Sequence, residues 1–97
     1  MQVTVNVPAS LRQYARGQRQ LVVECADALT LGEVLERLRV VAPGVVERAL
    51  DEQGRIRPHV NVFVDGQSIR AGSPLGVQTP VAPGVEVWIL PAVSGGS

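Results

Sequence analysis

The sequence is poor in aromatic residues and in cysteine. Tyr14, Phe63 and Trp88 are its only aromatics, so we expect a core built from aliphatic side chains. Cys25 stands alone, which excludes an internal disulfide and a zinc site made of clustered cysteines. The chain also lacks an apolar run near the ~20 residues that span a bilayer, and its first residues do not have the layout of a signal peptide. We therefore expect a soluble, cytoplasmic protein.

An excess of charge of one sign is missing too. Nine basic and nine acidic residues give a formal net charge of zero, and the basic residues form no block, so we expect no nucleic-acid partner. The group Arg12, Arg16 and Arg19 is typical of a solvated face, with rim contacts to an acidic partner as the alternative. His59 has no cysteine or histidine nearby, so we expect no metal site there.

The sequence does contain a strong alternation of aliphatic and other residues. Val60, Val62 and Val64 alternate with less apolar positions, which is typical of a strand with one buried face. Asp65-Gly66 directly after them indicates a tight turn. By the same criteria, strands are predicted at residues 3–7, 19–25, 60–64, 67–70 and 85–90.

One helix begins at a clear capping motif. Thr30 and Glu33 have the spacing of a capping box, in which each side chain binds the other residue's backbone N–H. Apolar residues at helical spacing follow it, namely Leu31, Val34, Leu35 and Leu38. Pro43-Gly44 is expected to end this helix, and residues 45–50 to form a second short helical segment. The polar residues 9–18 favour a connection with a turn at its end.

The order of these elements predicts an α+β fold. A hairpin, one crossover helix and further strands suit a mixed sheet of four to five strands with one main helix on one face. The valine faces of the strands would pack under the apolar face of that helix. A chain of 97 residues has room for one such domain.

Several stretches resemble a known family. "VTVNVPASLR" at 3–12, "HVNVFVDG" at 59–66 and "GVEVWILPAVSGG" at 84–96 are similar to the MoaD/ThiS sulfur carriers, above all to their CysO-like branch. The resemblance covers nearly the whole chain. It implies a ubiquitin-like β-grasp domain over residues 1–91 and a flexible C-terminal Gly-Gly tail over residues 92–97.

The resemblance also implies a function. In this family an E1-like enzyme uses ATP to adenylate the C-terminal glycine, here Gly96, and the adenylate becomes a thiocarboxylate that donates sulfur to a synthase. The chain itself would be a carrier, not an enzyme, and would bind no cofactor. ATP and a sulfur source would be used by the activating partner. Gly95 and Gly96 suit this role because backbone without Cβ atoms fits a narrow channel.

Ser97 departs from the family pattern, since it puts the reactive carboxylate on the wrong residue. One explanation is that a metal-dependent peptidase removes Ser97 to expose Gly96; the other is an altered chain end. We favour removal. A frayed terminus without chemistry is the remaining interpretation of this segment.

The strand alternation predicts a second candidate site. If the valines face the helix, then Phe63, Trp88 and Leu90 face away from it on neighbouring strands. Clustered apolar side chains on an open face usually mark a partner site, here for the activating enzyme or the sulfur acceptor. The alternatives are that a loop covers them or that they are exposed singly. Other function classes also stay open, namely a ubiquitin-like protein modifier and an interaction module without acyl chemistry.

Overall fold

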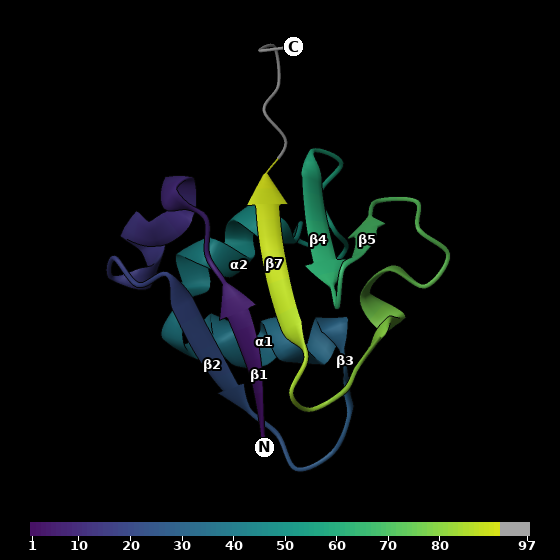
Figure 1. Cartoon of the computed structure of the whole chain (residues 1–97). Coiled ribbons are helices and arrows are strands. Elements are labelled where there is room, and N and C mark those ends of the chain that lie inside the picture. The colour runs from purple at the N-terminus through teal and green to yellow at the C-terminus, as the bar shows by residue number, and fades with distance from the viewer. Residues whose placement is uncertain (92–97) are drawn as a thin grey trace.

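A five-stranded mixed sheet forms one layer of the molecule and two helices form the other (Figure 1). The computed structural model describes residues 1–91. The strands of the sheet, in spatial order, are β2 (Gln20–Glu24), β1 (Gln2–Asn6), β7 (Glu86–Pro91), β4 (Val60–Val64) and β5 (Gln67–Arg70). This is the ubiquitin-like β-grasp arrangement, as predicted.

The central pair of the sheet is parallel. β1 and β7 run in the same direction, and every other neighbouring pair is antiparallel. Val60, at the start of β4, therefore lies across from Pro91, at the end of β7. We call this edge of the sheet the Pro91 end. The N-terminus lies at the opposite end (Figure 1).

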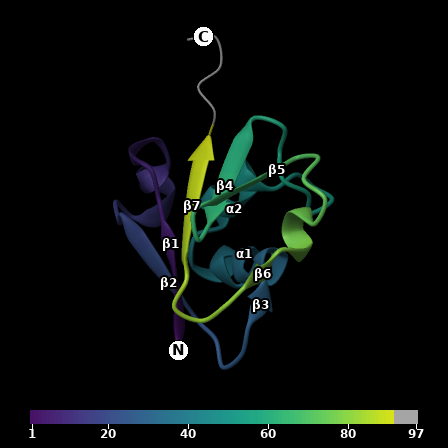
Figure 2. The same cartoon turned by 45° about the vertical axis from the view of Figure 1, so that its right-hand side comes forward.

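Both helices lie on the same face of the sheet (Figure 2). α1 (Leu31–Val41) begins with the predicted capping box: the backbone N–H of Glu33 donates to Thr30 Oγ1 at 3.1 Å, and the N–H of Thr30 donates to Glu33 Oε1 at 2.8 Å. α2 (Pro43–Ala49) follows after the single residue Ala42. Pro43 thus occupies the first turn of the second helix, where its missing N–H costs no hydrogen bond.

The core lies between these layers and is aliphatic. The residues that the alternation assigned to the inner face are buried, most of them completely, except Val85, which precedes β7 and is only partly buried. They include Val3, Val5, Val62, Val87 and Ile89 from the sheet and Leu31, Val34, Leu35 and Leu38 from α1. None of the three aromatics belongs to the buried set.

The structure adds elements that the sequence pattern did not indicate. Residues 9–18, expected to be an irregular connection, contain a 3-10 helix, η1 (Ala9–Ala15), because Leu11 and Ala15 bury one side of it. The loop after β5 contains a second one, η2 (Gly76–Gln78). Two very short strands, β3 (Leu29–Thr30) and β6 (Pro80–Val81), pair with each other beside α1. The Asp65-Gly66 turn is confirmed, with positive φ at both residues.

η1 packs against α2 through the aromatic ring of Tyr14, which contacts Gly44 directly. A Cβ added to Gly44 would lie 2.7 Å from Tyr14 Cδ1 and 2.9 Å from Tyr14 Cβ. The guanidinium of Arg48 lies 3.6 Å from the centre of the Tyr14 ring, on its face, and donates a hydrogen bond to the Gly44 carbonyl at 3.2 Å. Gly44 therefore determines how closely η1 approaches α2.

Gly44→Ala should destabilise the protein by about 1–3 kcal/mol, the usual cost of overpacking. The measurement is urea unfolding. The control is a double-mutant cycle with Tyr14→Ala, since removal of the ring deletes the 2.7 Å contact with Cδ1 and should reduce the cost of Gly44→Ala, while the contact with the remaining Cβ at 2.9 Å stays. Equal costs of Gly44→Ala in both backgrounds would contradict the proposed contact.

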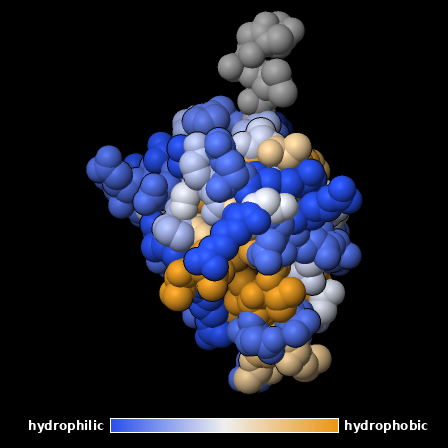
Figure 3. Space-filling view, turned by 90° about the vertical axis from the view of Figure 1, so that its left-hand side faces the viewer, coloured by the Kyte–Doolittle hydropathy of each residue, from blue (hydrophilic) through white to orange (hydrophobic). Residues whose placement is uncertain are grey.

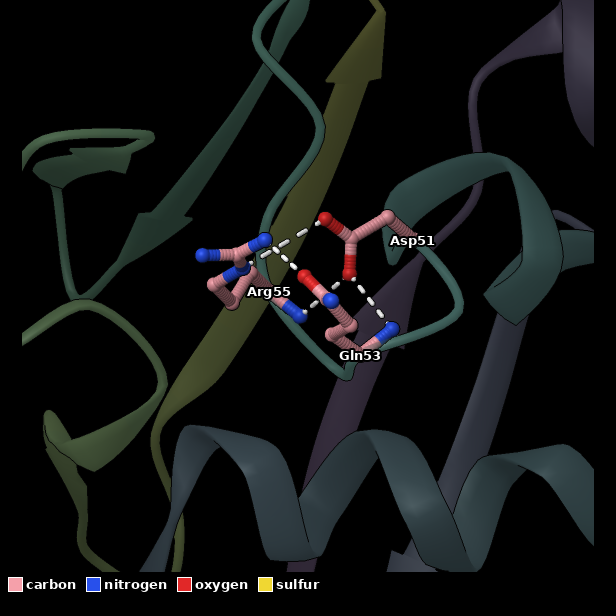
Figure 4. Close-up of polar contacts among 3 residues, drawn as sticks. All are labelled: Asp51, Gln53 and Arg55. Atoms are coloured by element: carbon pink, nitrogen blue, oxygen red, sulfur yellow. Dashed lines mark hydrogen bonds and ion pairs between the residues drawn. The ribbon is translucent and has the colours of Figure 1, made fainter.

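A tight turn joins α2 to the segment that leads into β4 (Figure 4). Asp51 Oδ1 accepts hydrogen bonds from the backbone N–H groups of Gln53 and Arg55, both at 2.9 Å. Asp51 Oδ2 forms an ion pair with the Arg55 side chain at 3.6 Å, and that guanidinium also donates to the Gln53 side chain. The hydrogen bond from the Arg55 backbone is the main reason that the pKa of the Asp51 carboxyl is lowered.

Asp51→Asn should lower the melting temperature at neutral pH. A carboxyl whose folded pKa is lowered stabilises the fold above its ordinary pKa of about 4, and this contribution is lost as the pH falls through the folded value. The difference in melting temperature between wild type and variant should therefore shrink as the pH is lowered from about 6 to about 3. Glu52→Gln is the control, because it removes a neighbouring charge that takes no part in the turn. A difference in melting temperature that does not change with pH would show that the Asp51 carboxylate in this turn is not the cause of the lower stability.

Candidate functional site

The face of the sheet opposite the helices carries a group of large apolar side chains. Phe63 lies directly across from Trp88 in the antiparallel pair β4–β7, and Leu90 is two residues further along β7. Trp88 is 43% exposed and Leu90 36%, whereas Phe63 is half-buried. The three residues therefore lie on the face that the alternation predicts. We call them the open-face cluster.

The open-face cluster lines a shallow hollow of about 560 Å³. The other lining residues come from the ends of β4 and β7, namely Asp65, Gly66, Gly84, Val85 and Glu86. Two carboxylates thus stand beside an apolar surface. Because Trp88 and Leu90 remain exposed, no loop within residues 1–91 covers them, which removes one of the alternatives left open by the sequence.

A polar network supports Trp88 on its other side. The register of β1 and β7 places Asn6 beside Trp88. The Asn6 amide donates to Glu86 Oε1 at 2.9 Å and accepts from Gln20 Nε2 at 3.0 Å, so the network crosses three strands. Asn6 is only 3% exposed, and a buried amide with both polar atoms paired holds its neighbours in one arrangement.

Sequence analysis missed this network. Alternation alone places Asn6 and Glu86 on the open face, but their contact depends on the pairing of β1 with β7, two strands that are far apart in the chain. The signal that points to it is an asparagine in a valine-rich strand, since a buried amide requires partners.

The remaining candidates are not brought together with this face. Cys25 is buried, and His59 is exposed at the Pro91 end. Within residues 1–91 no group of three or more histidine, cysteine or acidic residues is placed to hold a metal ion. No helix in the same part of the chain is long and apolar enough to cross a membrane. Gly95, Gly96 and Ser97 lie outside the described residues.

Comparison with known proteins places this fold in a family. Residues 5–96 match the ThiS family, a match that begins near the end of β1 and extends through Gly96. The chain belongs to the ThiS family. This ThiS-family chain is 37% identical to the sulfur carrier protein CysO of Mycobacterium tuberculosis, with 99% of this chain and all of CysO covered.

Two further relatives of the ThiS-family chain bear on its function. Small archaeal modifier protein 3 of Haloferax volcanii is 30% identical, with 99% of this chain and all of that protein covered. The crystal structure of a BexX/CysO complex from Amycolatopsis orientalis is similar with a TM-score of 0.80 at 28% identity, covering 96% of this chain and 98% of that one. Sulfur carriers and a protein modifier are thus both among the similar proteins.

Proposed function

We propose that this chain is a sulfur carrier whose C-terminal glycine, Gly96, is converted to a thiocarboxylate after Ser97 is removed. The observation that carries the proposal is its similarity to CysO over the full length of both chains. The chain acts as a co-substrate, and the catalytic groups belong to its partners. Residues 1–91 serve as the globular carrier domain and residues 92–97 as its reactive tail.

The chemistry requires two steps at one carboxylate. The Gly96 carboxylate attacks the α-phosphorus of ATP in an E1-like activating enzyme, and pyrophosphate leaves. A sulfide-level sulfur then displaces AMP from the acyl carbon and leaves the thiocarboxylate. Gly95 and Gly96 present no side chain to the walls of the enzyme channel. Oxyanion stabilisation comes from the enzyme, so the carrier needs only an accessible end and a surface for docking.

The open-face cluster is the proposed docking surface for the activating enzyme or the sulfur-accepting synthase. Trp88 and Leu90 belong to the strand that leads into the tail, so a partner that binds them also receives the C-terminus. Tryptophan at the centre of an apolar surface is typical of residues that dominate binding energy. Cysteine biosynthesis is the first choice of acceptor pathway, a thio-containing metabolite the second and a cofactor such as molybdopterin the third. A metal-dependent peptidase is the proposed agent of Ser97 removal.

Chains that end at Gly96 and at Ser97 should behave differently with ATP, an E1-like enzyme and a sulfide source. The chain 1–96 should gain the mass difference between sulfur and oxygen, because thiocarboxylate replaces carboxylate. The chain 1–97 should stay unchanged until a peptidase removes Ser97. Intact-protein mass spectrometry distinguishes these species. An unchanged mass for the chain 1–96 would contradict the proposed formation of a thiocarboxylate at Gly96.

Trp88→Ala should weaken binding to the activating enzyme while the fold is retained. A buried interface tryptophan contributes more than about 2 kcal/mol, so the affinity should fall at least about thirtyfold. Calorimetry measures the affinity, and circular dichroism checks the fold. Val22→Ala is the matched control, because Val22 is 49% exposed and lies on β2, two strands away from β7. Equal losses for both variants, or none for Trp88→Ala, would refute the assigned docking role.

The second candidate function is that of a ubiquitin-like protein modifier, favoured by the similarity to small archaeal modifier protein 3. In that case the activated Gly96 would form amide bonds with lysines of other proteins. The mass experiment separates the two functions when it is repeated in a cell extract, since conjugates of high mass support the modifier and a free thiocarboxylate supports the carrier.

A further inference from the structure

The basic residues of the chain are concentrated at one end of the fold. All nine are arginines. Strand register and contacts place six of them around the Pro91 end: Arg12, Arg16, Arg19, Arg48, Arg57 and Arg70. We call these six the arginine rim. Carboxylates also lie beside them: Glu47 lines one hollow with Arg48, Arg57 and His59, and Asp51 and Glu52 line another with Glu47 and Arg57.

The sheet topology explains this concentration. The end of β1 leads into η1, which carries Arg12, and the Val7 N–H donates to the Arg19 carbonyl at 2.7 Å. Arg70 lies across from Asn61, which in turn lies across from Leu90. Arg57 accepts a hydrogen bond at its carbonyl from the N–H of Val60, the residue across from Pro91. Segments that are distant in sequence thus meet around the end of β7.

The rim arginines are held without carboxylate partners. Arg12 donates to the Val7 carbonyl at 3.1 Å and Arg57 to the Glu47 carbonyl at 2.9 Å, whereas Arg48 lies on the Tyr14 ring. Within residues 1–91, none of the six has a carboxylate oxygen within 4.0 Å; the ion pairs in this part of the chain join Glu36 to Arg39 and Asp51 to Arg55. Arg16, Arg19, Arg48 and Arg70 are exposed. Their charge is therefore available to a partner.

Acidic residues gather at the other end of the sheet. Glu24 lies across from Gln2, Glu86 is the first residue of β7, and Asp65 follows β4 directly. The molecule is neutral as a whole, and its charges are unevenly distributed along β7, although Arg37 also lies at the acidic end, where it donates to the Glu24 carbonyl. Figure 3, which shows the side formed by β2 and η1, has mostly hydrophilic surface near the Pro91 end and both apolar and hydrophilic surface toward the other end. An external negative potential would turn the Pro91 end toward its source.

We propose that the arginine rim docks on an acidic protein surface that surrounds the site receiving the C-terminus. This inference rests on the proposed function and adds the charge of the partner to it. Guanidinium groups pair with carboxylates through two parallel hydrogen bonds, which single ammonium groups do not offer. An apolar cluster with arginines toward one end and the carboxylates of Asp65 and Glu86 at the other has the apolar centre and polar rim of a protein interface, and a net charge of zero disfavours nucleic acid. The rim accelerates encounter and orients the tail, while the open-face cluster supplies most of the affinity.

The test compares two pairs of substitutions with the same change in net charge. Arg16→Gln with Arg19→Gln removes two exposed rim charges, and Arg37→Gln with Arg39→Gln removes two charges from α1. In the chain 1–96, the rim pair should slow association with the activating enzyme about three- to tenfold at low salt, and 0.5 M salt should abolish most of this difference. The α1 pair should leave the rate nearly unchanged. At saturating enzyme all forms should reach the same yield of thiocarboxylate.

A second measurement identifies the partner chemistry without the enzyme. Titration with poly-L-glutamate, followed by amide resonances, should shift residues at the Pro91 end and spare those around Glu24 and Asp65. Equal association rates for both pairs, or shifts spread over the whole molecule, would overturn the docking role of the rim. Stronger binding of a short DNA duplex at the same residues would overturn the choice of an acidic protein. Absence of thiocarboxylate from every form, wild type included, would instead refute the proposed function.

Discussion

The parallel pairing of β1 with β7 is the constraint on which the rest of the structure depends. It places the final strand of the domain in the centre of the sheet, where Val87 and Ile89 are fully buried on one face and Trp88 and Leu90 are exposed on the other. A central strand is held on both sides, so its end is a fixed point from which the chain departs. The same pairing brings Asn6 to Glu86 and carries η1 to the end of the sheet where β7 finishes. The anchoring of β7, the position of the open-face cluster and the placement of η1 thus all depend on this one strand pair.

Much of the fold was predictable because its determinants are local. The valine alternation of β4, the capping box of Thr30 and Glu33, and the Asp65-Gly66 turn each involve residues within a few positions of one another. η1 was not predictable in this way, since a polar segment forms a 3-10 helix here only because Leu11 and Ala15 find a surface to cover. Pro43 predicts the end of a helix, and it also begins the next one, because the first turn of a helix tolerates proline.

The candidate site also has parts that local sequence determines and parts that depend on distant segments. Alternation assigned Phe63, Trp88 and Leu90 to one face, and the register places Phe63 directly across from Trp88. Two features could not be predicted from the sequence because they are non-local. The Asn6 network forms only when β1 lies beside β7, and the arginine rim forms only because of the directions in which the five strands run. Arg12, Arg16 and Arg19 were recognised only as a local group. Their additional partners, Arg48, Arg57 and Arg70, come from segments whose positions the sheet alone determines.

A carrier protein and an enzyme place different demands on a fold, and the proposed function requires those of a carrier. An enzyme must hold reacting groups in a water-excluding pocket, whereas a carrier must present one end of its chain to the pockets of others. The valine-rich sheet provides rigidity, and the glycines that follow it provide a backbone without side chains. Between these lies an apolar patch bordered by Asp65 and Glu86, with the arginine rim at the Pro91 end. Such a surface separates two tasks, because long-range charge governs how the chain arrives and short-range apolar contact governs how long it stays. Under the proposed function several partners would use the same tail in turn, and fast arrival with limited residence would then serve the chain better than the highest attainable affinity.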